Sequence, residues 1–226
     1  IDFFPSPEAR DAFIKRIADN DTYLQAFPDQ NHFNQFFNYD FGCGHVNPAY
    51  VTSLLQLMDT WRQKLQTMSC LRTETFDTAQ LTLKEEGVQY NDITAPYLIF
   101  CDGVAAVQNP FFHLLPFAAN KGEALFIESE DLNNEHVFKR GMLLAPLAQK
   151  GLFWAGSNYE LSFDDVRPTQ AFYESMKARL QQWLKVPFKI VDHQAAVRPA
   201  TLERRPFVGM HPMHRQIGIL NGMGTK

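Results

Sequence analysis

The sequence predicts a mixed α+β fold, in which an antiparallel sheet flanked by helices is joined to part of an α/β domain. Helical and strand-like patterns alternate in the first half of the 226 residues. In the middle, strand-like runs bounded by Gly, Pro, Asn and Asp follow one another as in an antiparallel meander. We expect segments 1–105 and 201–226 to belong to the α/β domain and segment 106–200 to form the sheet domain.

Three helices are expected from capping residues and from apolar residues at helical spacing. Ser6-Pro7-Glu8 supplies a hydroxyl N-cap, a Pro at the first helical position and an acid in the first turn. A second helix is expected after Asn47-Pro48, and a third from Pro168 to before Pro187. Steps of three and four residues predict one buried face on each of these two helices. The faces consist of Leu54, Leu55, Met58, Trp61 and Leu65, and of Phe172, Met176, Leu180, Trp183 and Leu184.

Strands are expected where short apolar runs stop at turn residues. The expected strands are 36–45, 71–76, 80–83, 87–90, 97–100, 122–129, 136–145, 151–155, 188–196, 207–209 and 217–220. The run Tyr97-Leu98-Ile99-Phe100 is continuously apolar and stops at Cys101-Asp102-Gly103. This pattern is typical of a buried parallel strand that ends at a ligand.

Composition limits the classes of partner. The chain is 45% hydrophobic and 20% charged, as soluble globular proteins are, and its net charge is −4. No basic field predicts binding to nucleic acid or to an anionic membrane. No run approaches the roughly 18 apolar residues of a membrane helix, and no signal peptide is evident. We therefore expect a cytoplasmic protein, and a homo-oligomer remains open.

Neither the cysteines nor the histidines have the spacing of a metal site. Cys43, Cys70 and Cys101 are odd in number and far apart, which fits neither a disulfide framework nor a zinc site. We expect reduced thiols and no metal.

Two features of the C-terminal region are candidates for a binding site. In Gly222-Met223-Gly224, the absence of side chains at the glycines would let backbone amides approach a flat ring, although a simple strand-end turn explains the same residues. The guanidinium of Arg198 would match a carboxylate through two hydrogen bonds, whereas the alternative is an arginine that satisfies buried carbonyls. Tyr159 and Trp154 lie near the end of an expected strand, where either could line a pocket or pack in the core.

Four motifs in order resemble the D-amino-acid oxidase and glycine oxidase family of flavoproteins. The first three are His45-Val46-Asn47-Pro48 before a helix, the strand and turn 97–103, and Lys121-Gly122-Glu123 at the start of a strand. The fourth is the C-terminal series in which Arg198-Pro199 is followed by 206–209 and by 217–224. The resemblance covers roughly residues 36 to 226. It implies that the sheet domain binds substrate and that the α/β part belongs to an FAD-binding domain.

The resemblance also implies roles for individual residues. FAD would accept a hydride from a C–H bond of an amine or amino acid, with Arg198 gripping the substrate carboxylate and Tyr159 lining the substrate pocket. The residues expected to frame the flavin are Cys101, Asp102, Gly103, Gly222, Met223, Gly224, Thr225 and Lys226. Substrate, electron acceptor and any covalent link to the flavin remain open.

One departure bears on activity. The family's Gly-x-Gly-x-x-Gly fingerprint, which holds the pyrophosphate at a helix N-terminus, does not occur in this sequence. We therefore expect a longer parent protein to bind FAD, and this chain by itself to bind FAD weakly and to be inactive. The alternative function is a non-catalytic module that binds a small acid or another protein.

Overall fold

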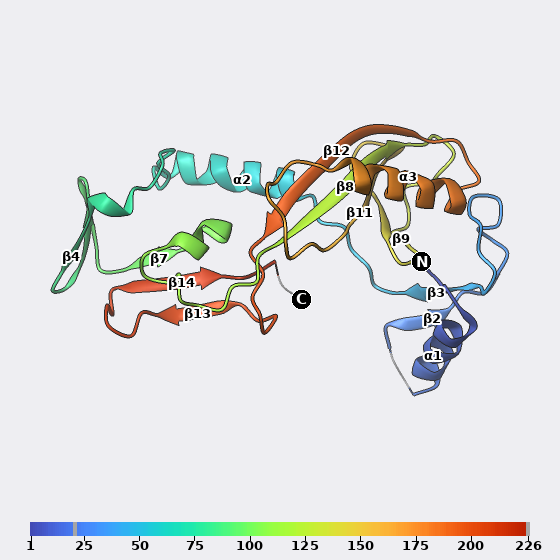
Figure 1. Ribbon diagram of the computed structural model, residues 1–226, viewed down its shortest axis with the longest axis horizontal. Helices are drawn as coiled ribbons and strands as arrows, with labels where there is room; N and C mark the ends of the chain where they lie inside the picture. Colours follow the sequence, from blue (N-terminus) through green and yellow to red (C-terminus); the bar gives the residue numbers. More distant parts are fainter. Residues whose placement is uncertain (20–21, 225–226) are drawn as a thin grey trace. The chain divides into compact units, whose positions relative to one another are not determined.

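The computed structural model describes residues 1–19 and 22–224, and its mixed α+β fold confirms the predicted class (Figure 1). The helices are α1 (Pro7–Ala18), α2 (Leu54–Thr67) and α3 (Gln170–Trp183), with 3₁₀ turns η1 (Thr78–Gln80) and η2 (Gly103–Gln108). The strands are β1 (Asp2–Phe3), β2 (Leu24–Ala26), β3 (Cys43–Val46), β4 (Leu81–Lys84), β5 (Gly87–Tyr90), β6 (Ile93–Ala95), β7 (Leu98–Phe100), β8 (Asn120–Glu128), β9 (Phe138–Lys139), β10 (Leu143–Pro146), β11 (Leu152–Gly156), β12 (Lys189–Arg198), β13 (Phe207–Met210) and β14 (Ile217–Asn221).

The chain forms two compact units, each built from three separate stretches. The first unit contains residues 1–63, 123–158 and 167–195, and the second contains 64–122, 159–166 and 196–226. These limits differ from the expected boundaries at 105 and 200. The reason is that β8 and β12 each begin in one unit and end in the other, so a strand rather than a linker joins them.

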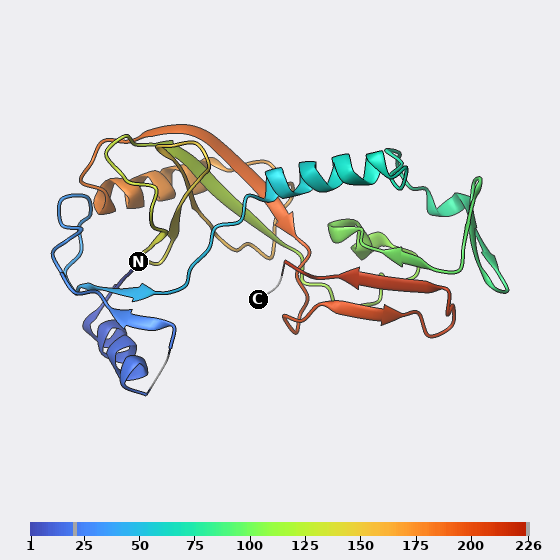
Figure 2. The ribbon, with the colours of Figure 1, turned by 180° about the vertical axis from the view of Figure 1, so that it is seen from behind.

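The first unit is built on a sheet of eight strands in the order β12-β8-β11-β10-β9-β1-β3-β2. Helix α3 lies against the part of this sheet that contains β8 and β11 (Figures 1 and 2). Phe172, Met176, Leu180 and Trp183 of α3 are buried, and Leu184 just after it is buried too, which confirms the predicted face. Aromatic rings fill the remaining core, with the Phe37 ring tilted against its neighbours, 4.7 Å from Phe138 and 5.0 Å from Trp183 between ring centroids. Burial of this apolar surface is the main source of the unit's stability.

A fully buried carboxylate ties α3 to the sheet. Glu123 on β8 accepts hydrogen bonds from the backbone N of Thr169 at 2.6 Å and from its hydroxyl at 2.8 Å. The Nε2 atom of His193 on β12 lies 3.0 Å from the same carboxylate. Thr169 is in turn the N-cap of α3, accepting from the backbone N of Phe172. Hydrogen bonds from several donors offset the cost of burying this charge.

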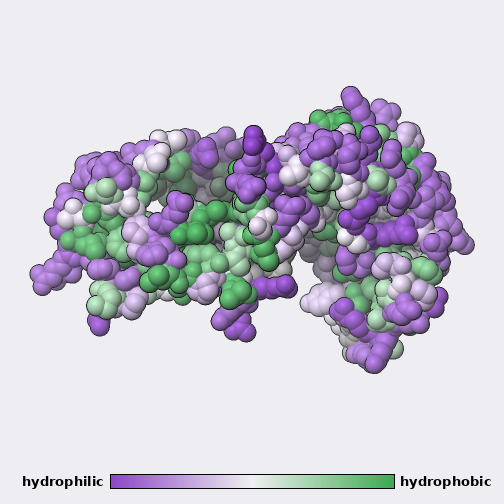
Figure 3. All heavy atoms as spheres, in the orientation of Figure 1, coloured by the Kyte–Doolittle hydropathy of each residue, from purple (hydrophilic) through white to green (hydrophobic). Residues whose placement is uncertain are grey.

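The second unit contains two small sheets, of which β13-β14-β7 is important for the site. Strand β14 pairs in parallel with β7, with Ile217 opposite Leu98 and Ile219 opposite Phe100. On one face of the sheet, Phe100, Ile217 and Ile219 are buried. The opposite face exposes apolar side chains, and Figure 3 shows hydrophobic surface on this unit. They are Ile99 (46% exposed), Val208 (72%), Met210 (46%) and Leu220 (42%).

Helix α2 differs most from the prediction. It begins at Leu54 rather than directly after Asn47-Pro48, and none of its side chains is buried. The predicted buried face is wrong, because Leu55 is 83% exposed and Trp61 is 50% exposed. Helical spacing of apolar residues reports that a helix has an apolar side, and it does not report which element covers that side.

Two of the predicted strands also differ from the strands in the structure. Residues 71–76 form no strand, and Phe76, which is 39% exposed, stacks on Tyr90 from a loop with 4.3 Å between ring centroids. The expected strand 36–45 is reduced to β3, although Phe37 makes an isolated bridge to Leu184. Within the part of the chain that the model describes, no helix is both long enough and apolar enough to cross a membrane.

Candidate cofactor and substrate site

Two turns expected to contact a cofactor lie at the same edge of one sheet. Cys101-Asp102-Gly103 follows β7, and Gly222-Met223-Gly224 follows β14. Because these strands are parallel, both turns leave the sheet at its carboxyl edge, where open α/β sheets bind ligands. Cys101, Met223 and Gly224 are exposed. The structure thus brings together six of the eight residues expected to frame a flavin, while Thr225 and Lys226 lie outside the described residues.

A residue that the sequence analysis missed, Asn221, joins the two turns. Its side chain is 3% exposed, and its Nδ2 atom donates to Oδ1 of Asp102 at 3.1 Å and to the carbonyl of Gly103 at 2.9 Å. Its Oδ1 atom accepts from the backbone N of Gly222 at 2.7 Å. Asn109, also buried, donates to the other oxygen of Asp102 at 2.9 Å. The Asp102 carboxylate therefore organises this edge of the sheet.

Glycine is required at Gly222. Its φ is +79°, a conformation that residues with side chains rarely adopt, and a Cβ there would stand 2.5 Å from the Thr201 methyl. Gly103 also has a positive φ, of +58°, and a Cβ built there has nothing within 4 Å. The first turn therefore leaves open space at Gly103, whereas the second turn packs closely against Thr201.

The Arg-Pro turn lies beside the second glycine turn. A Cβ built at Gly224 would stand 3.2 Å from Cδ of Pro199 and 3.5 Å from Cβ of Arg198. The guanidinium of Arg198 covers Gly122, where any side chain would overlap it. Its Nη1 atom donates to Oδ1 of Asn120 at 2.8 Å. Arg198 is thus held between the start of β8 and the glycine turn.

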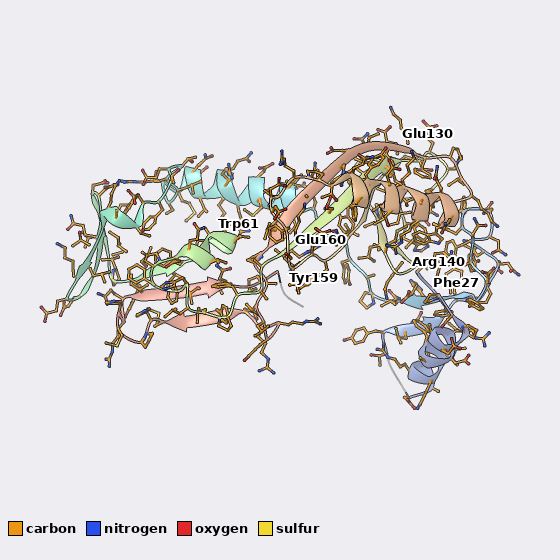
Figure 4. All side chains as sticks on the ribbon, viewed as in Figure 1. Phe27, Trp61, Glu130, Arg140, Tyr159 and Glu160 are labelled. Atoms are coloured by element: carbon orange, nitrogen blue, oxygen red, sulfur yellow. The ribbon has the colours of Figure 1, made fainter. Side chains whose placement is uncertain are left out.

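Tyr159 lies next to this arginine. Cζ of Arg198 is 6.0 Å from the centroid of the Tyr159 ring, at the limit of a cation–π contact, and Tyr159 is 57% exposed. Residue Glu160 forms a backbone bridge to Lys121, with N···O distances of 2.8 and 2.9 Å, which holds Tyr159 alongside β8 (Figure 4). The structure therefore places the two expected substrate residues together and adds Asn120, which the sequence analysis missed. Trp154 is on β11, and its role as a pocket residue has no support from this cluster.

The residues present fit one end of FAD. A cavity of about 430 Å³ opens at the carboxyl end of β7, lined by Cys101 and Asp102 together with Ile99 and Gln108. The turn 101–103 borders this cavity, whereas residues 222–224 are not part of its lining. The sequence contains no Gly-x-Gly-x-x-Gly fingerprint for the pyrophosphate. Nor do the described residues contain a group of three His, Cys, Asp or Glu side chains that could hold a metal.

Comparison with known proteins gives the fold a precedent. No protein-family model matches the chain. Glycine oxidase from Geobacillus kaustophilus superposes with a TM-score of 0.70 at 17% identity, over 98% of this chain and 64% of that protein. The chain has the glycine oxidase fold. L-proline dehydrogenase from P. horikoshii (TM-score 0.69, 14% identity, 99% of this chain and 66% of that one) and iminodiacetate oxidase from Chelativorans sp. BNC1 (0.67, 18%, 96% and 63%) share it.

The glycine oxidase fold confirms the fold expected from the four sequence motifs. The chain spans 63% of the length of iminodiacetate oxidase and 64% of that of the Geobacillus enzyme, so about a third of each has no counterpart in it. At such low identities the likeness concerns the fold, and the activity has to be argued from the site.

Proposed function

We propose that the whole protein is an FAD-dependent oxidoreductase that oxidises an amine or amino acid by transfer of a hydride from a substrate C–H bond. The observation that carries this proposal is the contact between the Arg-Pro turn and the glycine turn, with Gly224 packed against Arg198 and Pro199. It puts a residue suited to binding a carboxylate next to a turn suited to contacting a flat ring.

The chain's own residues would act by binding and orientation. Arg198 would hold the carboxylate through two hydrogen bonds, and the Tyr159 ring would limit where the rest of the substrate can lie. Backbone amides of residues 222–224 would face the ring of the cofactor. FAD, when bound, supplies a two-electron acceptor. The substrate loses a hydride and a proton to become an imine, which water hydrolyses, so no strong acid or base is needed on the protein.

Three parts of the sequence would serve this function in different ways. The turn 101–103 and the turn 222–224 would frame the cofactor, and the cluster of Arg198, Tyr159 and Asn120 would bind substrate. The exposed apolar face of β13-β14-β7 supports a further element of the whole protein that covers it, because sheets with parallel strands are usually covered on both faces. We propose that this element carries the pyrophosphate site.

The competing proposal is a non-catalytic module that binds a small acid. Arg198 supports it equally, because an arginine that grips a carboxylate need not belong to an enzyme. The two proposals differ in whether a bound amino acid is oxidised.

Anaerobic reduction of the FAD-loaded whole protein separates them. Glycine and L-proline would be tested beside methylamine and pyrrolidine, which are the same amines without the carboxylate, and iminodiacetate would be tested alone. We expect an amino acid to bleach the flavin while its matched amine does not. An FAD-loaded protein that binds these acids and is reduced by none of them would favour the module.

A further inference from the structure

Asn120, the first residue of β8, has one hydrogen-bonded atom and one unsatisfied atom in its side-chain amide. Its side chain is fully buried, and its Oδ1 atom accepts a hydrogen bond from Nη1 of Arg198 at 2.8 Å. Its Nδ2 atom is also buried, yet it has no hydrogen-bond partner among the described residues. Leaving a buried amide without a hydrogen-bond partner is unfavourable, so its presence in a folded protein needs a reason.

The orientation of this amide is determined by Arg198. A guanidinium only donates hydrogen bonds, so Oδ1 rather than Nδ2 must face it. Exchanging the two atoms would give Nδ2 no better partner and would set two donors against each other. The side chain therefore keeps the Arg198 contact at the expense of its own amide.

The choice of an amide rather than a carboxylate has an electrostatic consequence. Aspartate has nearly the same shape as asparagine and would bind a guanidinium more strongly, as an ion pair. It would also oppose the positive charge at the place where a substrate carboxylate is proposed to bind, and the substrate would then compete with it. A neutral Oδ1 fixes the guanidinium without adding negative charge.

We propose that Asn120 is a positioning residue that orients Arg198 while preserving its charge, and so makes the site prefer a carboxylate to a neutral group. This inference rests on the function proposed above. It assigns to Asn120 the discrimination between a carboxylate and its uncharged carboxamide. The groups around the guanidinium agree with this role, because Gly122 leaves room for it and the Tyr159 ring lies at 6.0 Å.

The test measures this discrimination directly in the FAD-loaded whole protein. The probes are glycine with glycinamide and L-proline with L-prolinamide, and the pair used is the one whose amino acid reduces the flavin. Binding of both members is measured by calorimetry in the wild type and in Asn120→Asp, without oxygen and with the flavin reduced beforehand, so that no hydride is transferred during the titration. Gln194→Glu is the matched control, because it adds the same charge at an exposed position of β12.

We expect Asn120→Asp to lower the preference for the acid over its carboxamide at least tenfold, with FAD affinity changed less than twofold. Gln194→Glu should leave the preference unchanged. Equal losses for acid and carboxamide in Asn120→Asp would show a structural role and would overturn the inference, as would an unchanged preference. A protein that binds FAD and oxidises none of the probes would instead overturn the proposed function.

A second variant covers the case in which Asn120→Asp does not fold. Asn120→Leu has a similar volume, removes the acceptor and also removes the unsatisfied amide. We expect it to fold and to lower the preference for the acid at least threefold, since the guanidinium loses its fixed orientation. A preference equal to that of the wild type would contradict the inference.

Discussion

Asn221 donates hydrogen bonds from a single amide nitrogen to the Asp102 carboxylate at 3.1 Å and to the Gly103 carbonyl at 2.9 Å. It lies at the end of β14, whereas Asp102 follows β7, so this buried side chain fixes the two proposed cofactor turns against each other. The geometry of the proposed flavin site would then depend on a residue that lies behind it.

Asn221→Asp should therefore separate the turns. The introduced carboxylate would face Asp102 and would no longer donate to Gly103, so repulsion replaces two hydrogen bonds. We expect a loss of about 2–4 kcal/mol in the free energy of unfolding and at least a tenfold weaker FAD affinity in the whole protein. Fluorescence titration with FAD and urea unfolding measure the two effects. Gln149→Glu, which adds a charge at an exposed site in the loop between β10 and β11, should change neither.

Arg198→Ala should raise the apparent KM for a carboxylate substrate at least tenfold. The loss of a charged hydrogen-bonding pair corresponds to about 1.5–3 kcal/mol. Arg198→Lys should recover only part of this, because an ammonium lacks the planar fork of a guanidinium. Steady-state kinetics of the whole protein measure the change, with the exposed Arg205→Ala as control. An unchanged KM in Arg198→Ala would remove this residue from the site.

Glu123→Gln should destabilise the first unit. The carboxylate accepts from Thr169 twice and from His193 once. An amide in its place removes the charge from these hydrogen bonds and forces the Thr169 hydroxyl to accept from the NH₂ group instead of donating. We expect a decrease of about 1–3 kcal/mol in the free energy of unfolding by urea. Glu128→Gln, at an exposed position of the same strand, should have almost no effect. Equal stability of the two variants would show that the buried network contributes little.

Stability should also fall in mild acid because of two histidines. Burial lowers the pKa of His45 and of His136 below the ordinary 6.5, and their rings lie 6.2 Å apart. The folded state therefore binds fewer protons than the unfolded state as the pH falls below 6.5. The stabilisation is complete above that pH and is lost as the pH falls through the lowered values. Urea unfolding between pH 5 and 7.5 should show this slope, and His136→Phe should reduce it.

Local sequence patterns predicted that a segment has an apolar face. The predicted burial of that face is correct only where another element packs on it. The spacing of Phe172, Met176 and Leu180 predicted a buried helix face because α3 packs on the sheet. The same kind of spacing in α2 predicted burial that does not occur, as Leu55 and Trp61 show. The apolar run that stops at Cys101 predicted a buried parallel strand, and β7 does pair in parallel with β14, although its Ile99 side is 46% exposed.

Single polar residues of the site were not predictable in this way. Asn120 meets Arg198 across 78 positions, Asn221 meets Asp102 across 119, and Glu123 meets His193 across 70. Nothing in the neighbouring sequence marks an asparagine or glutamate as buried, because its partner is brought near only by the sheet. Arg198 could be chosen because it belongs to a motif, whereas the residue that orients it could not.

The most direct test of the central claim is a visible absorption spectrum of the whole protein, purified and then supplied with FAD. We expect the two-banded spectrum of a bound flavin after removal of excess cofactor, and loss of its visible absorption when a suitable amino acid is added without oxygen. A protein that stays colourless after FAD is supplied would contradict the oxidoreductase function and leave the acid-binding module in its place.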